Sequence, residues 1–324
     1  MTRRFSLEEA TDLAARAVHA AGASEEAALS LARATVSANA HGKGSSGFSH
    51  LMDYLTALRA GRIVGDAEPL VTSPAPAAIH CDARGGIAQL GFDQAFDDLR
   101  RRAEAFGLAL FAQNGSYTTG ELGYYPRRLV ETGLVAFAAT SGPALMAVAG
   151  AKTPVYCTNP LAFAAPLDDG PPLLIDQASS ATAFVELRRY AERSETLPPG
   201  WAVDAGGQPT TDPNAALRGA LLAFGGARGA NIALMVEVLA AGLAGANWAL
   251  DAPSFISGDR SPGAGLLVIA ITPALLAPDF PQRLRFQLDR LAKLGVHIPG
   301  RRAAAAEIEL PDALAAEIER AGAP

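Results

Sequence analysis

The stretch Ala40-His41-Gly42-Lys43-Gly44-Ser45-Ser46-Gly47-Phe48-Ser49-His50 decides how the fold is interpreted, because it carries a G-x-G-x-x-G string ahead of a predicted helix. A dinucleotide-binding turn of this type needs a strand before its first glycine, so that the next helix points its N-terminus at the phosphates. Residues 24–36 begin with a serine cap and are rich in Ala, Leu and Glu, which predicts a helix. The glycines therefore indicate a loop that passes close to a ligand, and not the first turn of a Rossmann unit.

The helix predicted after these glycines, residues 46–60, has two distinct faces. Ser46, His50 and Tyr54 recur every four residues, so they share one face. The neighbouring stripe is apolar and is expected to face the core: Leu51, Leu55 and Leu58. A polar row beside a buried stripe and next to a glycine loop favours the wall of a cleft, and a solvated helix side is the alternative.

The composition limits the classes of protein to which the chain can belong. Its 324 residues allow a large core in two lobes, and its formal net charge of −6 argues against nucleic acid or an anionic membrane as partner. Two cysteines are too few for a disulfide framework, and the five histidines are too far apart in sequence to suggest a metal site. With no signal-type segment and no apolar run of membrane-spanning length, we expect a soluble, cytoplasmic protein that binds no metal.

Local signals divide the chain into a helical beginning and an α/β remainder. Ser6 and Glu9 form a capping box, Gly22 ends the first helix, and a second helix is expected from Glu25. Residues 65–77 are predicted to be a linker because of their Pro and Gly content. Beyond them, strands are predicted at residues 78–81, 108–112, 134–139, 161–165, 173–175 and 266–271, and helices at 91–105, 125–132, 225–243 and 281–294. The continuous apolar runs within 134–175 suggest strands buried on both faces.

Polar side chains follow several of the predicted strands. Asp176 ends an apolar run and precedes Gln177-Ala178-Ser179-Ser180, and Tyr117 lies just beyond another strand end. Such positions are frequent ligand contacts. Helix capping is the alternative, with Ser180 as the cap of a helix that begins near Ala181.

The turn Gly225-Gly226-Ala227-Arg228-Gly229 opens an apolar helix. Free N–H groups at a helix start, together with an arginine, favour an anion such as phosphate. Glycines that serve only packing are the alternative interpretation.

These pieces resemble one family along nearly the whole chain. The matching stretches, in order, are residues 42–61, 157–166, 176–180, 197–204, 209–213, 225–229 and 234–239. They are similar to the malate/L-lactate dehydrogenase-like NAD(P)-dependent oxidoreductases, nearest the branch that reduces Δ1-piperideine-2-carboxylate and Δ1-pyrroline-2-carboxylate. The run Gly219-Ala220-Leu221-Leu222-Ala223-Phe224-Gly225-Gly226 points to the same branch.

The resemblance implies an α/β fold with a non-Rossmann cofactor lobe, built on a mostly antiparallel mixed sheet, and a helical lobe built from the N-terminal region. It implies that residues 1–74 form the helical lobe with the substrate loop and that residues 75–275 form the NAD(P)-binding lobe. Residues 276–324 are then a C-terminal helical segment that packs back on both lobes. It also implies a homodimer.

The chain departs from the family pattern at its chemical centre. The usual Ser-His-Gly is Ser45-Ser46-Gly47 here, so the family's proton-transferring histidine is a serine. The usual substrate-binding arginine is His50, and Glu186 takes the place of the acid that completes a relay in the imino-acid branch. We interpret His50 and Tyr117 as replacement proton donors, because an imidazole changes its protonation near neutral pH. A protonated His50 is also a candidate partner for the substrate carboxylate.

The resemblance assigns the remaining roles residue by residue. The catalytic set is Ser45, Ser46, His50, Tyr117 and Glu186. The substrate-binding set is His50, Tyr54 and Thr158. The cofactor-binding set is Tyr117, Thr118, Thr119, Asn159, Asp176, Gln177, Ala178, Arg228, Gly229 and Arg301. The arginines that are candidates to meet a 2′-phosphate, none of them placed by spacing, are Arg188, Arg189, Arg193, Arg301 and Arg302.

We predict an enzyme that uses NADPH, with NADH as the alternative, to reduce a small cyclic imino acid of the Δ1-pyrroline-2-carboxylate type. Reducing a ketone requires a proton for the developing alkoxide, and losing a positioned acid removes ~10²–10⁴-fold in rate. A cyclic imine arrives already protonated on nitrogen, so a serine at position 46 matters less. Two alternatives remain open: a dehydrogenase of malate, lactate or sulfolactate with His50 as its acid, and a nucleotide-binding homologue without the family activity.

Overall fold

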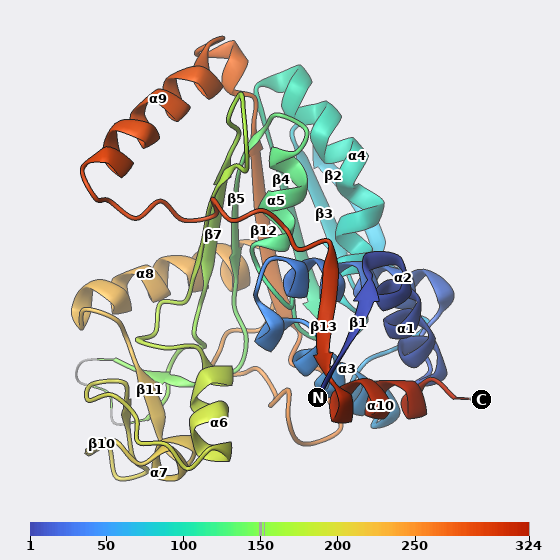
Figure 1. The fold of residues 1–324 in the computed structure, drawn as a ribbon, viewed down its shortest axis with the longest axis vertical. Helices are drawn as coiled ribbons and strands as arrows, with labels where there is room; N and C mark the ends of the chain where they lie inside the picture. The colour runs from blue at the N-terminus through green and yellow to red at the C-terminus, as the bar shows by residue number, and fades with distance from the viewer. Residues whose placement is uncertain (149–150, 152, 324) are drawn as a thin grey trace.

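The computed structural model describes residues 1–148, 151 and 153–323, and these form a mixed α/β fold (Figure 1). A seven-stranded sheet runs through the centre in the order β2-β3-β4-β12-β5-β7-β8. β3 and β4 are parallel, and the other neighbouring strands are antiparallel. The strands are β2 (Leu70–Ala75), β3 (Ala78–Asp82), β4 (Leu108–Ser116), β12 (Ala264–Ile271), β5 (Val135–Thr140), β7 (Leu161–Ala165) and β8 (Leu173–Gln177).

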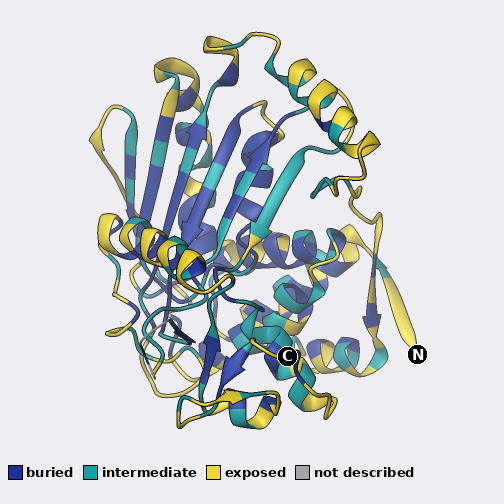
Figure 2. Cartoon of the chain, turned by 90° about the vertical axis from the view of Figure 1, so that its left-hand side faces the viewer, coloured by how far each residue is buried: buried dark blue, intermediate teal, exposed yellow. Residues whose placement is uncertain are grey.

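Successive residues of a strand point to opposite sides of the sheet, so both sides of this sheet carry apolar side chains. Helices cover both of these faces. Phe111 of β4 packs under α4 (Ala88–Phe106) and α5 (Tyr124–Val130). Its neighbour Ala112 belongs to a separate cluster on the other face. That face is covered by α8 (Ala227–Glu237) and the π-helical η2 (Val238–Leu243). The central strands are accordingly the most deeply buried part of the sheet (Figure 2).

The two ends of the chain meet in one helical layer beside the sheet (Figure 1). β1 (Thr2–Ser6) pairs antiparallel with β13 (Glu307–Pro311). The helices of this layer are α1 (Leu7–Ala20), α2 (Glu25–Ala40), α3 (Phe48–Arg59) and α10 (Asp312–Ala321). The predicted capping box is confirmed: Ser6 Oγ accepts from the Glu9 N–H at 3.2 Å, and the Ser6 N–H donates to the Glu9 carboxylate at 2.8 Å.

A smaller sheet lies beside the helical layer, at the same end of the large sheet (Figure 1). Its strands follow the order β10-β9-β11-β6. They are β6 (Met146–Ala147), β9 (Ala202–Val203), β10 (Pro209–Thr210) and β11 (Ala220–Leu222), and α6 (Phe184–Glu192) and α7 (Pro213–Leu217) pack near them. The short helix η3 (Pro273–Leu275) and α9 (Phe280–Lys293) follow β12. None of the helices in the described residues is long and apolar enough to cross a bilayer.

The third helix starts later than the sequence predicts. Residues 44–46 form a separate 3-10 turn, η1 (Gly44–Ser46), and α3 begins at Phe48. The break has a steric reason, because a Cβ on Gly47 would lie 1.9 Å from Asn39 Oδ1. That oxygen accepts the Phe48 N–H at 2.8 Å and so holds the start of α3 against α2. The predicted buried stripe of Leu51, Leu55 and Leu58 is confirmed.

Two local predictions and one of the alternatives are wrong. The predicted linker 65–77 contains β2, an exposed edge strand whose Pro74 sits at a register irregularity, so no alternation marks it in the sequence. β8 is not buried on both faces, because it is the other edge of the sheet. Ser180 caps no helix: its hydroxyl donates to the Thr182 carbonyl, and α6 begins at Phe184.

A buried ion pair joins the helical layer to the sheet. Arg127 of α5 binds the Glu121 carboxylate in the loop after β4 through both terminal nitrogens, and it also donates to Ser37 Oγ of α2 at 3.0 Å. Both charged side chains are almost inaccessible, at 5% and 2% exposure. Neither charge therefore has water as a substitute partner.

We expect Arg127→Met to lower the free energy of unfolding by about 3–5 kcal/mol, because it leaves Glu121 as a buried charge without its cation. Urea denaturation measures the change. The double variant Glu121→Gln/Arg127→Met is the control and should recover much of the loss. A single variant as stable as the unmodified protein would contradict this account of the pair.

Candidate active site

A cavity of about 640 Å³ lies where the helical layer, the large sheet and the small sheet meet. This volume falls within the ~300–1,000 Å³ that is common for small-molecule sites. Five segments form most of its wall: residues 42–46, 117–122, 140–143, 176–178 and 183–186. The wall thus combines the glycine loop, three strand ends and the start of α6.

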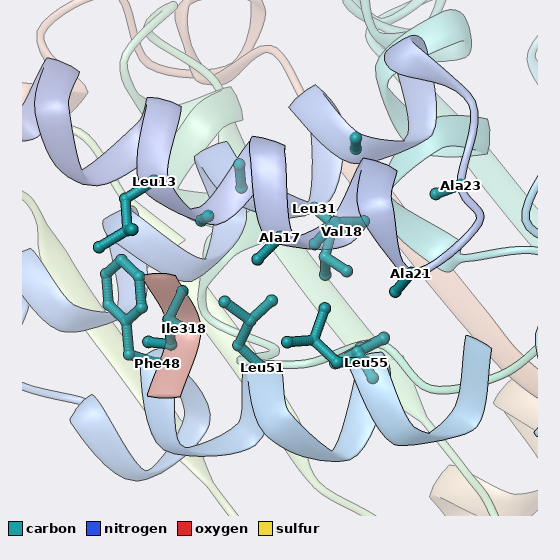
Figure 3. Packing of buried hydrophobic residues seen from close by; sticks show 14 of the residues in the cluster. Leu13, Ala17, Val18, Ala21, Ala23, Leu31, Phe48, Leu51, Leu55 and Ile318 are labelled. Atoms are coloured by element: carbon teal, nitrogen blue, oxygen red, sulfur yellow. The ribbon is translucent and has the colours of Figure 1, made fainter. Parts of the chain in front are cut away.

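α3 is held so that its polar side borders the cavity. Figure 3 shows Phe48, Leu51 and Leu55 pointing from α3 into the core of the helical layer, where they meet residues of α1 and α2. Because this stripe fixes the rotation of the helix, His50 and Asp53 lie at the cavity wall. The predicted cleft wall is confirmed for Ser46, which lies in η1, and for His50 of α3, whereas Tyr54 does not line the cavity.

His50, Asp53 and Arg188 form one cluster in this wall. His50 Nδ1 lies 3.0 Å from Asp53 Oδ2, and Arg188 Nη1 donates to the same oxygen at 3.1 Å. A carboxylate only accepts hydrogen bonds, so Nδ1 carries the proton and Nε2 is the ring nitrogen available to a ligand. Burial disfavours the ionised Asp53, but His50 and Arg188 outweigh it and lower the pKa of this carboxyl below its usual value. Asp53 is thus an ionised group that orients the imidazole.

Tyr54 lies behind this cluster and does not line the cavity. Its side chain is buried, and its hydroxyl accepts from Thr118 Oγ1 at 2.6 Å while donating to the Thr118 carbonyl at 3.2 Å. Burial raises the pKa of Tyr54 to about 12. The Thr118 hydroxyl proton is engaged with Tyr54, so His50 Nε2, at 3.5 Å from Thr118 Oγ1, keeps its capacity for another partner.

Tyr117 has its hydroxyl engaged within the protein. The hydroxyl donates to the Phe255 carbonyl at 2.6 Å, and the residue is 0% exposed. Burial raises the pKa of Tyr117 above its usual value, with the neighbouring Tyr54 and Asp53 adding to the effect. Of the two proton donors expected from the sequence, His50 is the one with a polar atom, Nε2, that is free for a ligand, because the Tyr117 hydroxyl is bound to the Phe255 carbonyl.

Asp176 ends β8 at the cavity wall. Its Oδ2 accepts the Gly123 N–H at 3.0 Å. Burial and the negative charge of Glu121 raise its pKa to about 6, although the Gly123 N–H works in the opposite direction. This strand end brings Gln177 and Ala178 to the same wall.

The other predicted site residues divide into two groups. Those that the cavity wall includes are Ser45, Ser46, Thr118, Thr119, Thr158 and Glu186, whose carboxylate is bound by Arg189 at 2.9 Å. Among the described residues, the wall does not include Asn159, Arg228, Gly229 or Arg301. Asn159 is fully buried and donates to Glu237 at 2.8 Å, whereas Arg228 is exposed at the start of α8. Within the described residues, no group of three His, Cys, Asp or Glu side chains is arranged to hold a metal.

Asp53 and Ser141 are residues of the cavity wall that the sequence did not indicate as part of the site. The spacing of His50 and Asp53, three residues apart on one helix, was a readable signal for their contact. No signal marked Ser141, whose buried hydroxyl borders the cavity without a partner among the described residues. Arg188 was considered only for a 2′-phosphate, and its contact with Asp53 spans 135 residues of sequence.

The fold and the cavity define a mixed α/β enzyme of small molecules, with an acid–base group in a cleft of metabolite size. The family model for malate/L-lactate dehydrogenase matches residues 5–314, and the chain belongs to this family of oxidoreductases. The family expected from the sequence is thereby confirmed.

Several known proteins are similar to the chain over nearly its whole length. A (2R)-3-sulfolactate dehydrogenase (NADP(+)) of Chromohalobacter salexigens is 38% identical, over 98% of both chains. A Δ1-pyrroline-2-carboxylate/Δ1-piperideine-2-carboxylate reductase of Pseudomonas aeruginosa is 36% identical, over 92% of this chain and 91% of the other. The crystal structure of Δ1-piperideine-2-carboxylate reductase from Pseudomonas syringae superposes with a TM-score of 0.93 at 32% identity, covering 98% and 99% of the two chains.

The cavity wall carries polar side chains that a nicotinamide nucleotide could contact. Hydroxyl groups of Thr118, Ser141 and Thr158 border it, and the buried Ser141 hydroxyl has no partner in the described part of the chain. Such an orphaned buried group is costly unless a ligand or water satisfies it. The polar residues present therefore fit a cofactor with hydrogen-bonding groups.

We expect Asp176→Asn to stabilise the protein at neutral pH by about 3 kcal/mol. With its pKa raised, the folded state binds more protons than the unfolded state between about pH 4 and pH 6, so Asp176 makes stability fall as pH rises through this window. Asparagine still accepts the Gly123 N–H but carries no charge. Denaturation of the nucleotide-free protein should therefore give similar stabilities near pH 4 and a gap that opens toward pH 7; a constant gap would contradict the assignment.

Proposed function

We propose that the protein is an NADPH-dependent reductase of small cyclic imino acids of the Δ1-pyrroline-2-carboxylate type. The observation that carries this proposal is the His50–Asp53 pair at the cavity wall, 3.0 Å apart, in a chain whose residue 46 is serine. Several relatives with the same reductase name, at 32–36% identity, support the substrate class. The P. syringae reductase structure, with its TM-score of 0.93, adds support from the fold.

The proposed reaction needs little acid catalysis at the substrate. Bound NADPH would supply a hydride to the C=N carbon. A protonated imine then becomes an amine without passing through an alkoxide, so no proton has to reach an oxygen. His50 Nε2 accepts the N–H of the bound iminium, which orients the C=N bond in the cavity. Asp53 keeps the Nδ1 proton in place and stabilises positive charge on the imidazole.

We propose that the cofactor is held by the antiparallel lobe and not by a Rossmann turn. The glycines of residues 42–47 lie between α2 and α3, so no strand precedes them. Thr118, Thr119 and the Asp176-Gln177-Ala178 strand end form the part of the wall that we assign to the nucleotide. Arg228 lies exposed at the start of α8, beside two glycines with positive φ, and we assign it to the diphosphate.

A second candidate is an NADP-dependent dehydrogenase of a 2-hydroxy acid. The 38% identical sulfolactate dehydrogenase is the specific observation in its favour. In that reaction His50 would have to transfer a proton to or from the hydroxyl oxygen. The rate of that reaction would then depend on His50 far more strongly than the rate of imine reduction does.

Purified protein with NADPH and Δ1-pyrroline-2-carboxylate should consume the nucleotide and form proline, because the imine needs no alkoxide-directed acid. The loss of reduced-nicotinamide absorbance measures it. (2R)-3-sulfolactate with NADP⁺ is the comparison substrate. Turnover of sulfolactate without turnover of the imine would replace the first proposal with the second, and turnover of neither at high enzyme concentration would refute both.

We expect His50→Ala to lower kcat for a 2-oxo acid by ~10²–10⁴-fold and kcat for the cyclic imine by less, because only the first substrate needs a delivered proton. Tyr117→Phe should change kcat less than His50→Ala does, since the Tyr117 hydroxyl is bound to the Phe255 carbonyl. Steady-state rates for the two variants with both substrates measure the difference. Equal effects of the two substitutions would remove His50 from its assigned role.

A further inference from the structure

The proposed substrate carries a carboxylate, and the cavity must supply a cation for it. Among the described residues that line the cavity, the side chains with permanent positive charge are Lys43, Arg188 and Arg189. Arg189 is bound to the Glu186 carboxylate at 2.9 Å. Lys43 is exposed on the glycine loop at the rim. Arg188 is the one that lies against the His50–Asp53 pair.

The guanidinium of Arg188 has donors to spare. Its contacts with Asp53, at 3.1 and 3.4 Å, both use Nη1. In the described part of the chain, Nε and Nη2 make no hydrogen bond, and the side chain is 37% exposed. These two nitrogens form the second edge of the planar group, which matches the two oxygens of a carboxylate.

Arg188 is also linked to the proton-handling group. Asp53 Oδ2 accepts from both Arg188 and His50, so one carboxylate oxygen fixes the relative position of a cation and an imidazole on two different helices. A 2-carboxylated imine has its carboxylate on the carbon next to nitrogen. A site for it therefore needs a cation and a hydrogen-bonding group close together, and this cluster provides both.

We propose that Arg188 binds the carboxylate of the substrate and that Asp53 is a positioning residue that ties this anchor to His50. The inference rests on the proposed function and deepens it. It makes α6 the source of substrate charge recognition, while α3 supplies the proton-handling group. It also predicts that the enzyme prefers imines with a carboxylate next to the C=N carbon over uncharged ones.

The test compares Arg188→Gln with Arg218→Gln, an exposed arginine at the C-cap of neighbouring α7 that does not line the cavity. Arg188→Gln should raise KM for Δ1-pyrroline-2-carboxylate by about 10–100-fold, the loss expected for a charged hydrogen-bonded contact. KM for Δ1-pyrroline, which lacks the carboxylate, should stay unchanged, as should NADPH affinity by fluorescence titration. Arg188→Lys should recover part of the loss, and Arg218→Gln should have no effect.

The variant Asp53→Asn tests the positioning of His50 separately from the binding of the substrate carboxylate by Arg188. It should lower kcat for both imines, because the imidazole is no longer held, with a smaller effect on KM than Arg188→Gln has. Thermal unfolding of each variant checks that the fold is intact. A rise in KM that is equal for both imines, or a rise that follows Lys43→Gln and not Arg188→Gln, would overturn the assignment of Arg188.

Binding of pyrrole-2-carboxylate distinguishes failure of this inference from failure of the proposed function. This planar ring acid has the same arrangement of ring nitrogen and carboxylate and requires no turnover. If the protein is inactive with the imine but binds the analogue in the presence of NADPH, and only Arg188→Gln abolishes binding, the anchor stands while the reaction fails. If the unmodified protein neither turns over the imine nor binds the analogue, both are overturned.

Discussion

The buried Glu121–Arg127 ion pair is the interaction on which the arrangement of the cavity depends. Arg127 on α5 holds the loop after β4 through Glu121 and reaches α2 through Ser37. The same loop carries Thr118 to the cavity and donates the Gly123 N–H to Asp176 at the end of β8. The ion pair thus connects α5 and α2 to the loop after β4, and this loop is in turn hydrogen-bonded to the end of β8. Since each charge is buried, neither partner can move without leaving the other uncompensated.

A rigid wall would allow the proposed catalytic residues to differ within the family without a change of fold. His50 lies one turn beyond Ser46 along the same side of the chain, and both border the same cavity. Moving an imidazole by one turn changes which atom of a bound substrate it reaches, while the leucine stripe of α3 stays packed. Asp53 fixes the orientation of the His50 ring, which packing alone would leave free, through its contact with Nδ1. Placing buried carboxylates close together has an electrostatic cost. It is seen at Asp176, because burial and the negative charge of Glu121 raise the pKa of its carboxyl.

The parts that sequence predicts well are those encoded within a few residues. The capping box at Ser6 and Glu9 and the buried face of α3 follow from spacings of three and four, and both are present. β2 could not be found this way, because an exposed edge strand has no alternating pattern and contains Pro74. The Arg188–Asp53 contact joins residues 135 apart, which no local spacing encodes. The predicted phosphate turn at Arg228 was an argument from local geometry, and its position relative to the nucleotide stays a prediction.

The comparisons narrow the chemistry without choosing between its two forms. The relatives named as imino-acid reductases and the one named as a sulfolactate dehydrogenase differ from this chain by nearly equal amounts, 36% against 38% identity. Sequence identity at that level shows that the chains share a fold, but it does not show which of the two reactions takes place in the cavity. The two reactions differ in where charge develops, on an oxygen that must be protonated or on a nitrogen that already carries a proton. The side chains that meet that atom decide the outcome, and the ones we propose for this role are His50, which Asp53 orients, and Arg188 beside it.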